Sequence, residues 1–195
     1  SNPTGVTVDD RVFEELSSIG VTIISDEIYH GLVYEGSERS VLEFTDNAVV
    51  INGFSKRFAM TGWRLGYMIA PKVLVGAIQR IHQNILISAG SFVQWGGVVA
   101  LKDCLSYAED MKKSFDERRK LTLSLLEDEG INVGYRPVGA FYVYLDLGDY
   151  IDDSYQFSLS LLSEKGVAVT PGIDFGPSGK KFIRISYATS KDNIE

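Results

Sequence analysis

The sequence predicts an α/β fold in two parts: a section of a large domain with a mostly parallel sheet, followed by a small α+β domain. Short apolar runs rich in β-branched residues alternate with longer helical patterns through the first half of the chain. From about Ile131, strand patterns become more frequent. We therefore expect the large-domain section over residues 1–105 and the small domain over residues 106–195.

The first part begins with a predicted helix at residues 8–19, where apolar side chains recur at helical spacing and a glycine then ends the pattern. The next apolar runs are short and largely β-branched, which is typical of strands buried on both faces of a parallel sheet. These runs predict strands at residues 21–25, 49–51 and 66–70. Long helical patterns follow at residues 72–87 and 93–127, and Trp63 and Trp95 are expected in the core.

After the helical pattern at 93–127, the second part contains three strand patterns and one further helical pattern. A strand is predicted at residues 140–145, a helix at 154–165, and further strands at 166–170 and 182–187. Taken alone, Arg184 in the last of these strands is typical of an arginine on an edge strand.

Composition and charge restrict the function. A chain of 195 residues buries roughly 70% of its unfolded surface on folding, so its core needs no disulfide or metal for stability. A net charge of -7, from 26 acidic and 19 basic residues, argues against binding to nucleic acids or anionic membranes. No apolar stretch approaches the ~20 residues that span a bilayer. Small molecules are therefore the expected partners.

The cysteine and histidine content excludes two kinds of site. Cys104 is the single cysteine and cannot form a disulfide within the chain. Two histidines with one cysteine cannot build a zinc site of Cys and His ligands. We therefore expect no metal centre, and a reducing cytoplasm is the expected compartment.

Candidate catalytic side chains follow the ends of predicted strands. Asp26 comes directly after the first strand, Lys56 follows the second, and Arg64 precedes the third. Ligands of open α/β folds bind at the carboxyl edge of the sheet. An amine, a carboxylate and an arginine there suit an aldehyde cofactor that carries a ring nitrogen and a phosphate. Taken singly, the three residues are more often a solvated lysine, a turn cap and half of a surface ion pair.

Seven short strings of the chain add to this pattern. They are Asn2-Pro3-Thr4-Gly5, Ser25-Asp26-Glu27-Ile28-Tyr29, Gly53-Phe54-Ser55-Lys56, Met60-Thr61-Gly62-Trp63-Arg64-Leu65-Gly66-Tyr67, Gly139-Ala140-Phe141-Tyr142, Pro171-Gly172 with Phe175-Gly176, and Phe182-Ile183-Arg184-Ile185-Ser186. In order and spacing, these strings resemble the motifs of the class I and II aminotransferases. The resemblance covers essentially the whole chain and implies the aspartate aminotransferase fold, with pyridoxal 5'-phosphate (PLP) as cofactor.

The resemblance implies a part in catalysis for three residues. Lys56 would form an imine with PLP and, once an amino acid displaces it, would move a proton between substrate and cofactor carbons. Asp26 would pair with the ring nitrogen and keep it protonated. Tyr29 would hydrogen-bond the ring oxygen.

Binding roles follow for four more residues. The resemblance implies that Asn2 contacts the ring oxygen and the substrate, that Ser55 and Arg64 bind the phosphate, and that Arg184 holds the substrate α-carboxylate. Gly53 departs from the family pattern, because many relatives have a hydroxyl residue two positions before Ser55. We expect one phosphate contact to come from the backbone or to be lost.

These roles predict transfer of an amino group between an L-amino acid and a 2-oxo acid, by a homodimer as in the family that the chain resembles. The alternative is the PLP-binding effector domain of a transcription regulator that also has a winged-helix DNA-binding domain. Such effector domains are similar in fold to the aminotransferases. The family has the Asn2–Gly5 string near mid-chain. We therefore expect the chain to be about the C-terminal half of a longer protein and to be inactive by itself.

Overall fold

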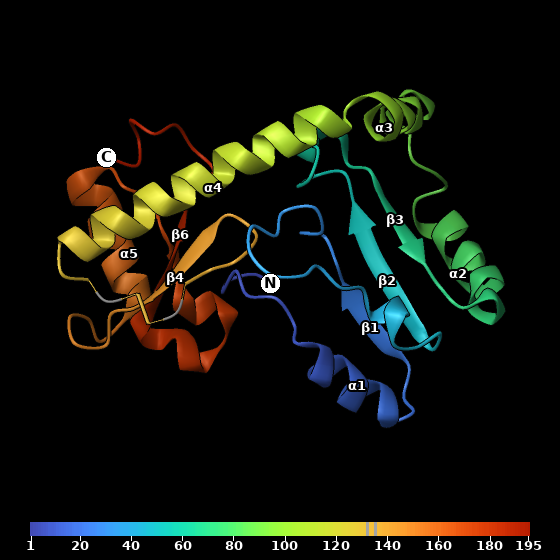
Figure 1. Ribbon diagram of the computed structural model, residues 1–195, viewed down its shortest axis with the longest axis horizontal. Helices are drawn as coiled ribbons and strands as arrows, with labels where there is room; N and C mark the ends of the chain where they lie inside the picture. The colour runs from blue at the N-terminus through green and yellow to red at the C-terminus, as the bar shows by residue number, and fades with distance from the viewer. Residues whose placement is uncertain (132, 135) are drawn as a thin grey trace. The chain divides into compact units, whose positions relative to one another are not determined.

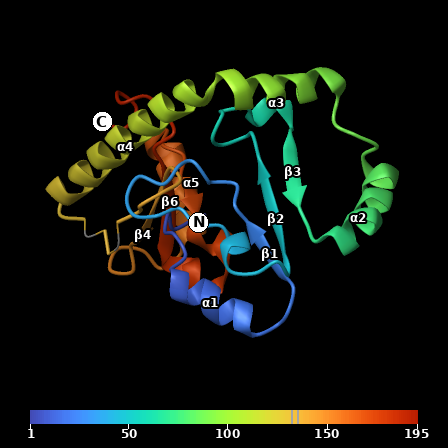
Figure 2. The ribbon, with the colours of Figure 1, turned by 45° about the vertical axis from the view of Figure 1, so that its right-hand side comes forward.

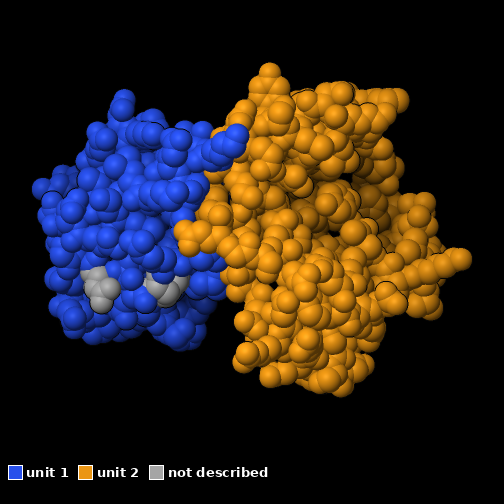
Figure 3. Space-filling view, viewed as in Figure 1, with its two compact units in different colours: residues 1–6, 113–195 blue, residues 7–112 orange. Residues whose placement is uncertain are grey.

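The computed structural model describes residues 1–131, 133–134 and 136–195. Their contacts divide the chain into two compact units (Figure 3): unit 1 comprises residues 1–6 and 113–195, and unit 2 comprises residues 7–112. The division falls inside the long helix α4 (Leu105–Asp128). The domain boundary at residue 105, which coincides with the start of this helix, stays a prediction.

The sheet of unit 2 has three strands in the order β1-β2-β3 (Figures 1 and 2). β1 (Ile23–Asp26) runs parallel to β2 (Ala48–Gly53), and β3 (Gly66–Ile69) runs antiparallel to β2. A short loop between β2 and β3 allows the antiparallel return, whereas the parallel pair needs the longer connection that contains the 3-10 turn η1 (Val41–Glu43). The chain is α/β, as predicted, with one parallel and one antiparallel pair in this sheet.

The core of unit 2 packs against one face of the sheet. Phe13 on α1 (Asp10–Ser18) stacks on Phe44, with ring centroids 5.1 Å apart, and both pack beside Val50 of β2. The expectation of strands buried on both faces is wrong for β1 and β3, because Ile24 of β1 is 72% exposed and every residue of β3 is exposed. Alternate strand residues point to opposite faces, and in β2 the consecutive residues Ala48, Val49 and Val50 are all buried, so the expectation holds for that part of β2.

The helices of unit 2 differ from the predicted ones in one important respect. α2 (Lys72–Ile85) agrees with its pattern, but the single helix expected at 93–127 is two helices, α3 (Ser91–Asp103) and α4. Cys104 interrupts them with a non-helical backbone, φ -112° and ψ 14°. The core positions expected for Trp63 and Trp95 are also wrong, since these side chains are 45% and 70% exposed.

Unit 1 contains an antiparallel sheet in the order β4-β6-β5, with α5 (Ser154–Lys165) and the second part of α4. β4 (Tyr142–Asp146) and β6 (Phe182–Ser186) carry the buried core, whereas β5 is reduced to Thr170–Pro171. The strand expected at 166–170 is therefore mostly loop. Gly166 has a φ of +70° and ends α5, which keeps the following residues out of the sheet until Thr170. Because β6 lies between β4 and β5, Arg184 is on a central strand and not on an edge strand.

Within the described ranges, no helix combines the length and the run of apolar residues that crossing a membrane requires.

Candidate functional site

Five of the seven predicted site residues lie in unit 2, at or next to one edge of its sheet. Asp26 is the last residue of β1, and the parallel register pairs it with Ile51 near the end of β2. Because β3 returns antiparallel, its first residue, Gly66, pairs with the last residue of β2, Gly53. The segments that follow β1 and β2 and precede β3 therefore leave the sheet at the same edge. These segments carry Asp26, Tyr29, Ser55, Lys56 and Arg64.

Backbone and side-chain hydrogen bonds fix the loop between β2 and β3, which carries Lys56. The Phe54 amide donates to the Leu65 carbonyl at 3.1 Å, which closes the base of the loop. The Thr61 hydroxyl donates to the Ser55 carbonyl at 3.0 Å, so the residue before Lys56 is tied to the far side of the loop. Lys56 and Ser55 are half-buried. The amine is thus carried by an ordered turn and not by a freely solvated segment.

Arg64 enters β3 from an unusual backbone conformation. Its φ of 54° and ψ of 43° are left-handed, which is uncommon for a residue with a side chain. One guanidinium nitrogen, Nη1, donates to the Thr61 carbonyl at 2.9 Å, and the side chain is exposed. This arrangement offers an anion a cation whose position is partly fixed by its own loop.

Local packing explains why Gly53 stands where the family pattern has a hydroxyl residue. A Cβ atom at this position would lie 3.0 Å from the Leu65 carbonyl oxygen and 3.2 Å from the Cα of Gly66. Both approaches are tighter than ordinary van der Waals contacts. The close pairing of β2 with β3 therefore favours glycine here, at the cost of a hydroxyl group.

The turn after β1 contacts the turn that carries Lys56. Gly31 has a φ of +86°, and a Cβ atom there would lie 2.5 Å from Cδ of Arg57. The stem of Arg57, the residue after Lys56, thus packs directly over the turn that begins at Asp26. Within the turn, the Ile28 amide donates to Oδ1 of Asp26 at 3.1 Å.

The other two predicted residues meet in unit 1. Nη1 of Arg184 donates to Oδ1 of Asn2 at 2.6 Å, and Nη2 donates to the Thr170 hydroxyl at 2.9 Å. The guanidinium carbon lies 4.2 Å from the Tyr142 ring centroid and 5.1 Å from that of Phe175. The buried Nε atom has no hydrogen-bond partner among the described residues. Two aromatic rings and two oxygen acceptors therefore hold a planar cation in one orientation.

Asn2 begins a turn that packs against residues 137–139. The Asn2–Pro3 peptide bond is cis, and Gly5 has a φ of +69°. The Gly5 carbonyl accepts hydrogen bonds from the amides of Val138, at 3.0 Å, and Gly139, at 2.8 Å. A Cβ atom at Gly5 would lie 2.5 Å from Cβ of Pro137, so the strings that begin at Asn2 and Gly139 pack as one motif.

Sequence reasoning did not identify Thr170, Tyr142 and Phe175 as neighbours of Arg184. The signal for Thr170 is the strand register, which pairs it with Arg184 across β5 and β6. Tyr144 is the β4 partner of Arg184, and Tyr142, two residues earlier on the same strand, lies on the same face of the sheet as Arg184. The alternation of faces along a strand could have suggested Thr170 and Tyr142, but the position of Phe175 depends on the 3-10 turn η3 (Gly172–Phe175).

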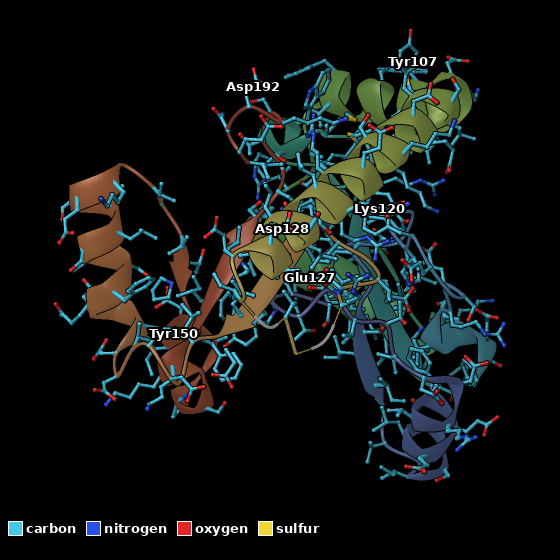
Figure 4. The ribbon with its side chains drawn as sticks, turned by 60° about the vertical axis from the view of Figure 1, so that its left-hand side comes forward. Tyr107, Lys120, Glu127, Asp128, Tyr150 and Asp192 are labelled. Atoms are coloured by element: carbon cyan, nitrogen blue, oxygen red, sulfur yellow. The ribbon has the colours of Figure 1, made fainter. Side chains whose placement is uncertain are left out.

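Two hollows are lined by other residues. One in unit 1, of about 1130 Å³, lies between α4, α5 and the sheet and includes Tyr150 in its lining. One in unit 2, of about 630 Å³, is lined mainly by apolar side chains of α3, α4 and the loop after Lys56, and Tyr107 lines it. Both tyrosines are labelled in Figure 4. Neither lining includes any of the seven predicted site residues.

Comparison with known proteins identifies the family. Residues 1–195 match the family described as "Aminotransferase class I and II". The chain is 45% identical to a (5-formylfuran-3-yl)methyl phosphate transaminase of Methanocaldococcus jannaschii, in an alignment that covers all of this chain and 53% of that protein. It is 38% identical to an aspartate aminotransferase of Pyrococcus horikoshii, covering 52% of that protein. The crystal structure of an aminotransferase from Mycobacterium tuberculosis matches with a TM-score of 0.93 and 38% identity, over 99% of this chain and 52% of that one.

The chain therefore belongs to the class I and II aminotransferases and has the fold of aspartate aminotransferases, as the resemblance implied. It spans about half the length of the relatives that it matches. The alternative of a winged-helix regulator receives no support from these comparisons.

Proposed function

We propose that the protein containing this chain is a PLP-dependent aminotransferase that transfers an amino group between an L-amino acid and a 2-oxo acid. One observation carries the proposal: in a chain of this family, Lys56 follows a strand at the same sheet edge as Asp26 and Arg64. An amine, a carboxylate and a guanidinium match the aldehyde, the ring nitrogen and the phosphate of PLP. The side chains present at this edge thus fit the cofactor.

The residues of unit 2 have distinct roles in this proposal. When bound, PLP supplies a ring that accepts electrons from the bond broken at the substrate carbon. Lys56 attaches the cofactor, and its Nζ atom carries the proton that moves between the substrate carbon and the cofactor carbon. Asp26 keeps the ring nitrogen protonated, since a neighbouring carboxylate stabilises the charged form. Tyr29 binds the ring oxygen, and Ser55 and Arg64 bind the phosphate.

The residues of unit 1 recognise the substrate carboxylate in this proposal. The fork of Arg184 matches a carboxylate group, and its stacking between Tyr142 and Phe175 reduces the freedom that binding must remove. Asn2, already hydrogen-bonded to Nη1, contacts the ring oxygen and the substrate. Because an α-carboxylate is common to all amino acids, these contacts define the substrate class and not its side chain.

A homodimer is part of the proposal. Apolar side chains from the end of α2 to the first turns of α3 are strongly exposed, namely Ile85 at 70%, Ile87 at 79%, Phe92 at 74% and Trp95 at 70%. Exposed apolar groups that are this close in the sequence support a protein interface. Sedimentation of the protein containing this chain tests the assembly, and a monomer at micromolar concentration would contradict it. The cytoplasm stays a prediction from the single cysteine.

Absorbance spectroscopy tests the attachment of the cofactor. We expect the protein containing this chain to give a visible band with PLP that borohydride abolishes, and the variant Lys56→Ala to lack it. The matched control is Lys72→Ala, because Lys72 begins α2 after the far end of β3 and should not affect the band. A band that survives in Lys56→Ala would contradict the proposed role.

A transfer assay distinguishes an enzyme from a regulator that merely binds PLP. Amino acid is added in excess over the loaded protein, and the 2-oxo acid released is measured. We expect about one oxo acid per bound cofactor, followed by turnover once a second oxo acid is supplied. Cofactor binding through Lys56 without release of an oxo acid would refute the aminotransferase function.

A further inference from the structure

A buried carboxylate lies next to Asp26 in the chain but faces the other way. Glu27 is only 6% exposed, although charged side chains are rarely buried without partners. Its amide donates to the Ile51 carbonyl at 2.9 Å, so the extended β1–β2 pairing continues through this residue. Adjacent side chains of an extended segment point to opposite faces. Glu27 therefore faces the core, whereas Asp26 is exposed at the sheet edge.

Several donors converge on the Glu27 carboxylate. Oε1 accepts hydrogen bonds from the Ser25 hydroxyl at 3.1 Å, the Ser40 hydroxyl at 3.0 Å and the Val41 amide at 3.0 Å. Oε2 lies 3.3 Å from Nδ1 of His30, which belongs to the same turn as Asp26. The carboxylate thus joins both ends of this turn to a segment fourteen residues further along the chain.

The segment that Glu27 contacts is firmly anchored. Ser40 caps the 3-10 turn η1 in a capping box with Glu43. Val41 is fully buried and packs with Phe13 in the core of unit 2. A tie to Ser40 and Val41 is therefore a tie to a rigid part of the unit.

The turn itself is short and places Tyr29 between two residues that this network holds. The His30 amide donates to the Glu27 carbonyl at 3.0 Å, and the Leu32 amide donates to the Tyr29 carbonyl at 3.0 Å. Leu32 is fully buried. With Glu27 fixed at one end and Leu32 at the other, the positions of Asp26 and Tyr29 depend on where the Glu27 carboxylate is held.

We propose that Glu27 is a positioning residue of the PLP site: its hydrogen bonds to Ser25, Ser40 and Val41 hold the turn that presents Asp26 and Tyr29 to the cofactor ring. This inference rests on the proposed function, in which those two side chains bind the ring. Glu27 faces away from Asp26 and acts through the backbone that it holds. Errors of about 1 Å in such positions can cost roughly a hundredfold in catalysis, so a tightly held turn is of direct use to the site.

Two variants of Glu27 test this role in the protein containing this chain. Glu27→Ala removes every acceptor, and we expect it to weaken PLP binding about tenfold or more and to shift the pH at which the visible band of bound PLP changes. Glu27→Gln keeps an amide oxygen whose two lone pairs can accept two of the three hydrogen bonds, and we expect it to restore both properties to within about threefold of the wild type. The dissociation constant of PLP and the pH midpoint of the band are measured for each.

A matched control separates positioning from stability. Leu123→Ala shortens an apolar side chain of α4 in unit 1 that is only 2% exposed, so it leaves a cavity in the core of that unit. We expect this variant to lower the melting temperature while leaving the PLP affinity and the pH midpoint unchanged. If Glu27→Ala does not fold, Ser40→Ala removes one of the three donors to the carboxylate together with the cap of η1, and it should weaken PLP binding by roughly two- to fivefold in the same direction.

The outcomes are distinct. A Glu27→Ala protein that is less stable but binds PLP with wild-type affinity and midpoint would overturn the inference while leaving the proposed function intact. If Glu27→Gln loses as much PLP affinity as Glu27→Ala, the proposed role of the Glu27 hydrogen bonds is overturned. Where Ser40→Ala is used in place of Glu27→Ala, wild-type PLP affinity in that variant would overturn it as well. A wild-type protein without a Lys56-dependent band would refute the proposed function, and the positioning role would be overturned with it.

Discussion

Substitution of Arg119 by methionine should weaken the support beneath the Asn2–Gly5 turn. Arg119 lies on α4 and is only 2% exposed. Its Nη1 donates to the Pro137 carbonyl at 2.7 Å, and the next two amides along the chain bind Gly5. Its Nη2 lies 2.7 Å from Oδ1 of Asp116. Methionine preserves most of the apolar stem and removes the charge and the donors.

The expected loss can be worked out from these contacts. The fully buried Pro137 would lose the donor to its carbonyl, and an unpaired buried acceptor costs about 1–3 kcal/mol. Asp116 keeps Lys120 at 2.6 Å and is 25% exposed, so loss of its pair with Arg119 adds about 1 kcal/mol at most. The free energy of unfolding should therefore fall by about 1–4 kcal/mol.

Equilibrium unfolding in urea measures this loss, with Arg118→Met as the control. Arg118 is the adjacent arginine, lies over the Phe115 ring at 5.7 Å and is only half-buried. We expect its replacement to cost about 0.5–1 kcal/mol. The reasoning fails if Arg119→Met costs less than about 1 kcal/mol or no more than the control.

Three further predictions concern packing, pH and substrate recognition. Gly179→Ala should lower the free energy of unfolding by about 3 kcal/mol, because its Cβ would lie 2.0 Å from the Gly172 carbonyl oxygen; wild-type urea unfolding would contradict this. Burial would raise the pKa of Asp116, but hydrogen bonds and charges of the neighbouring lysine and arginine outweigh it and hold the pKa below its ordinary value. Its contribution to stability should be present above about pH 4 and be lost as the pH falls through the lowered pKa, so the stability gap between the wild type and Asp116→Asn should be wide at pH 7 and narrow in acid. Arg184→Lys should reduce kcat/KM for the amino acid about a hundredfold with unchanged PLP affinity, because a lysine can neither form the fork nor stack on Tyr142 at 4.2 Å; a loss under threefold would count against the carboxylate role.

The arrangement of the sheet edge could be predicted from the sequence because it depends on local patterns. Asp26 and Lys56 follow short β-branched runs, and such runs predict where strands end. The observed register brings the segments after both strands to one edge, together with the segment that contains Arg64. The catalytic and binding roles of these residues stay predictions, since they follow from the resemblance and not from the strand pattern.

Other features depend on contacts between distant residues and left no local signal. The side chain of Glu27 is buried because Ser40 and Val41 approach it, and their sequence gives no sign of that approach. The break at Cys104 is similar, because the surrounding residues include the good helix formers Lys102 and Leu105 and no Gly or Pro, and only the observed backbone shows two helices. The contact of Phe175 with the Arg184 guanidinium is also of this kind, because it depends on the 3-10 turn η3.

Several apolar residues of the unit 2 sheet are exposed although the sequence pattern predicts that they are buried. Ile24, Ile51 and Met68 are 72%, 40% and 47% exposed, although the runs that contain them predict burial on both faces. Burial of such a side chain contributes about 1.5–3 kcal/mol, so a sequence that repeatedly places apolar groups on this face is adapted to a covering layer. The chain spans about half the length of its relatives, and the described residues leave these three side chains exposed, although Val49 on the same face is buried. The pattern therefore predicts that the layer over Ile24, Ile51 and Met68 comes from outside the described residues. Hydrogen exchange of the backbone amides along β1 and β2, measured in the protein containing this chain, tests that expectation, because covered strands exchange slowly.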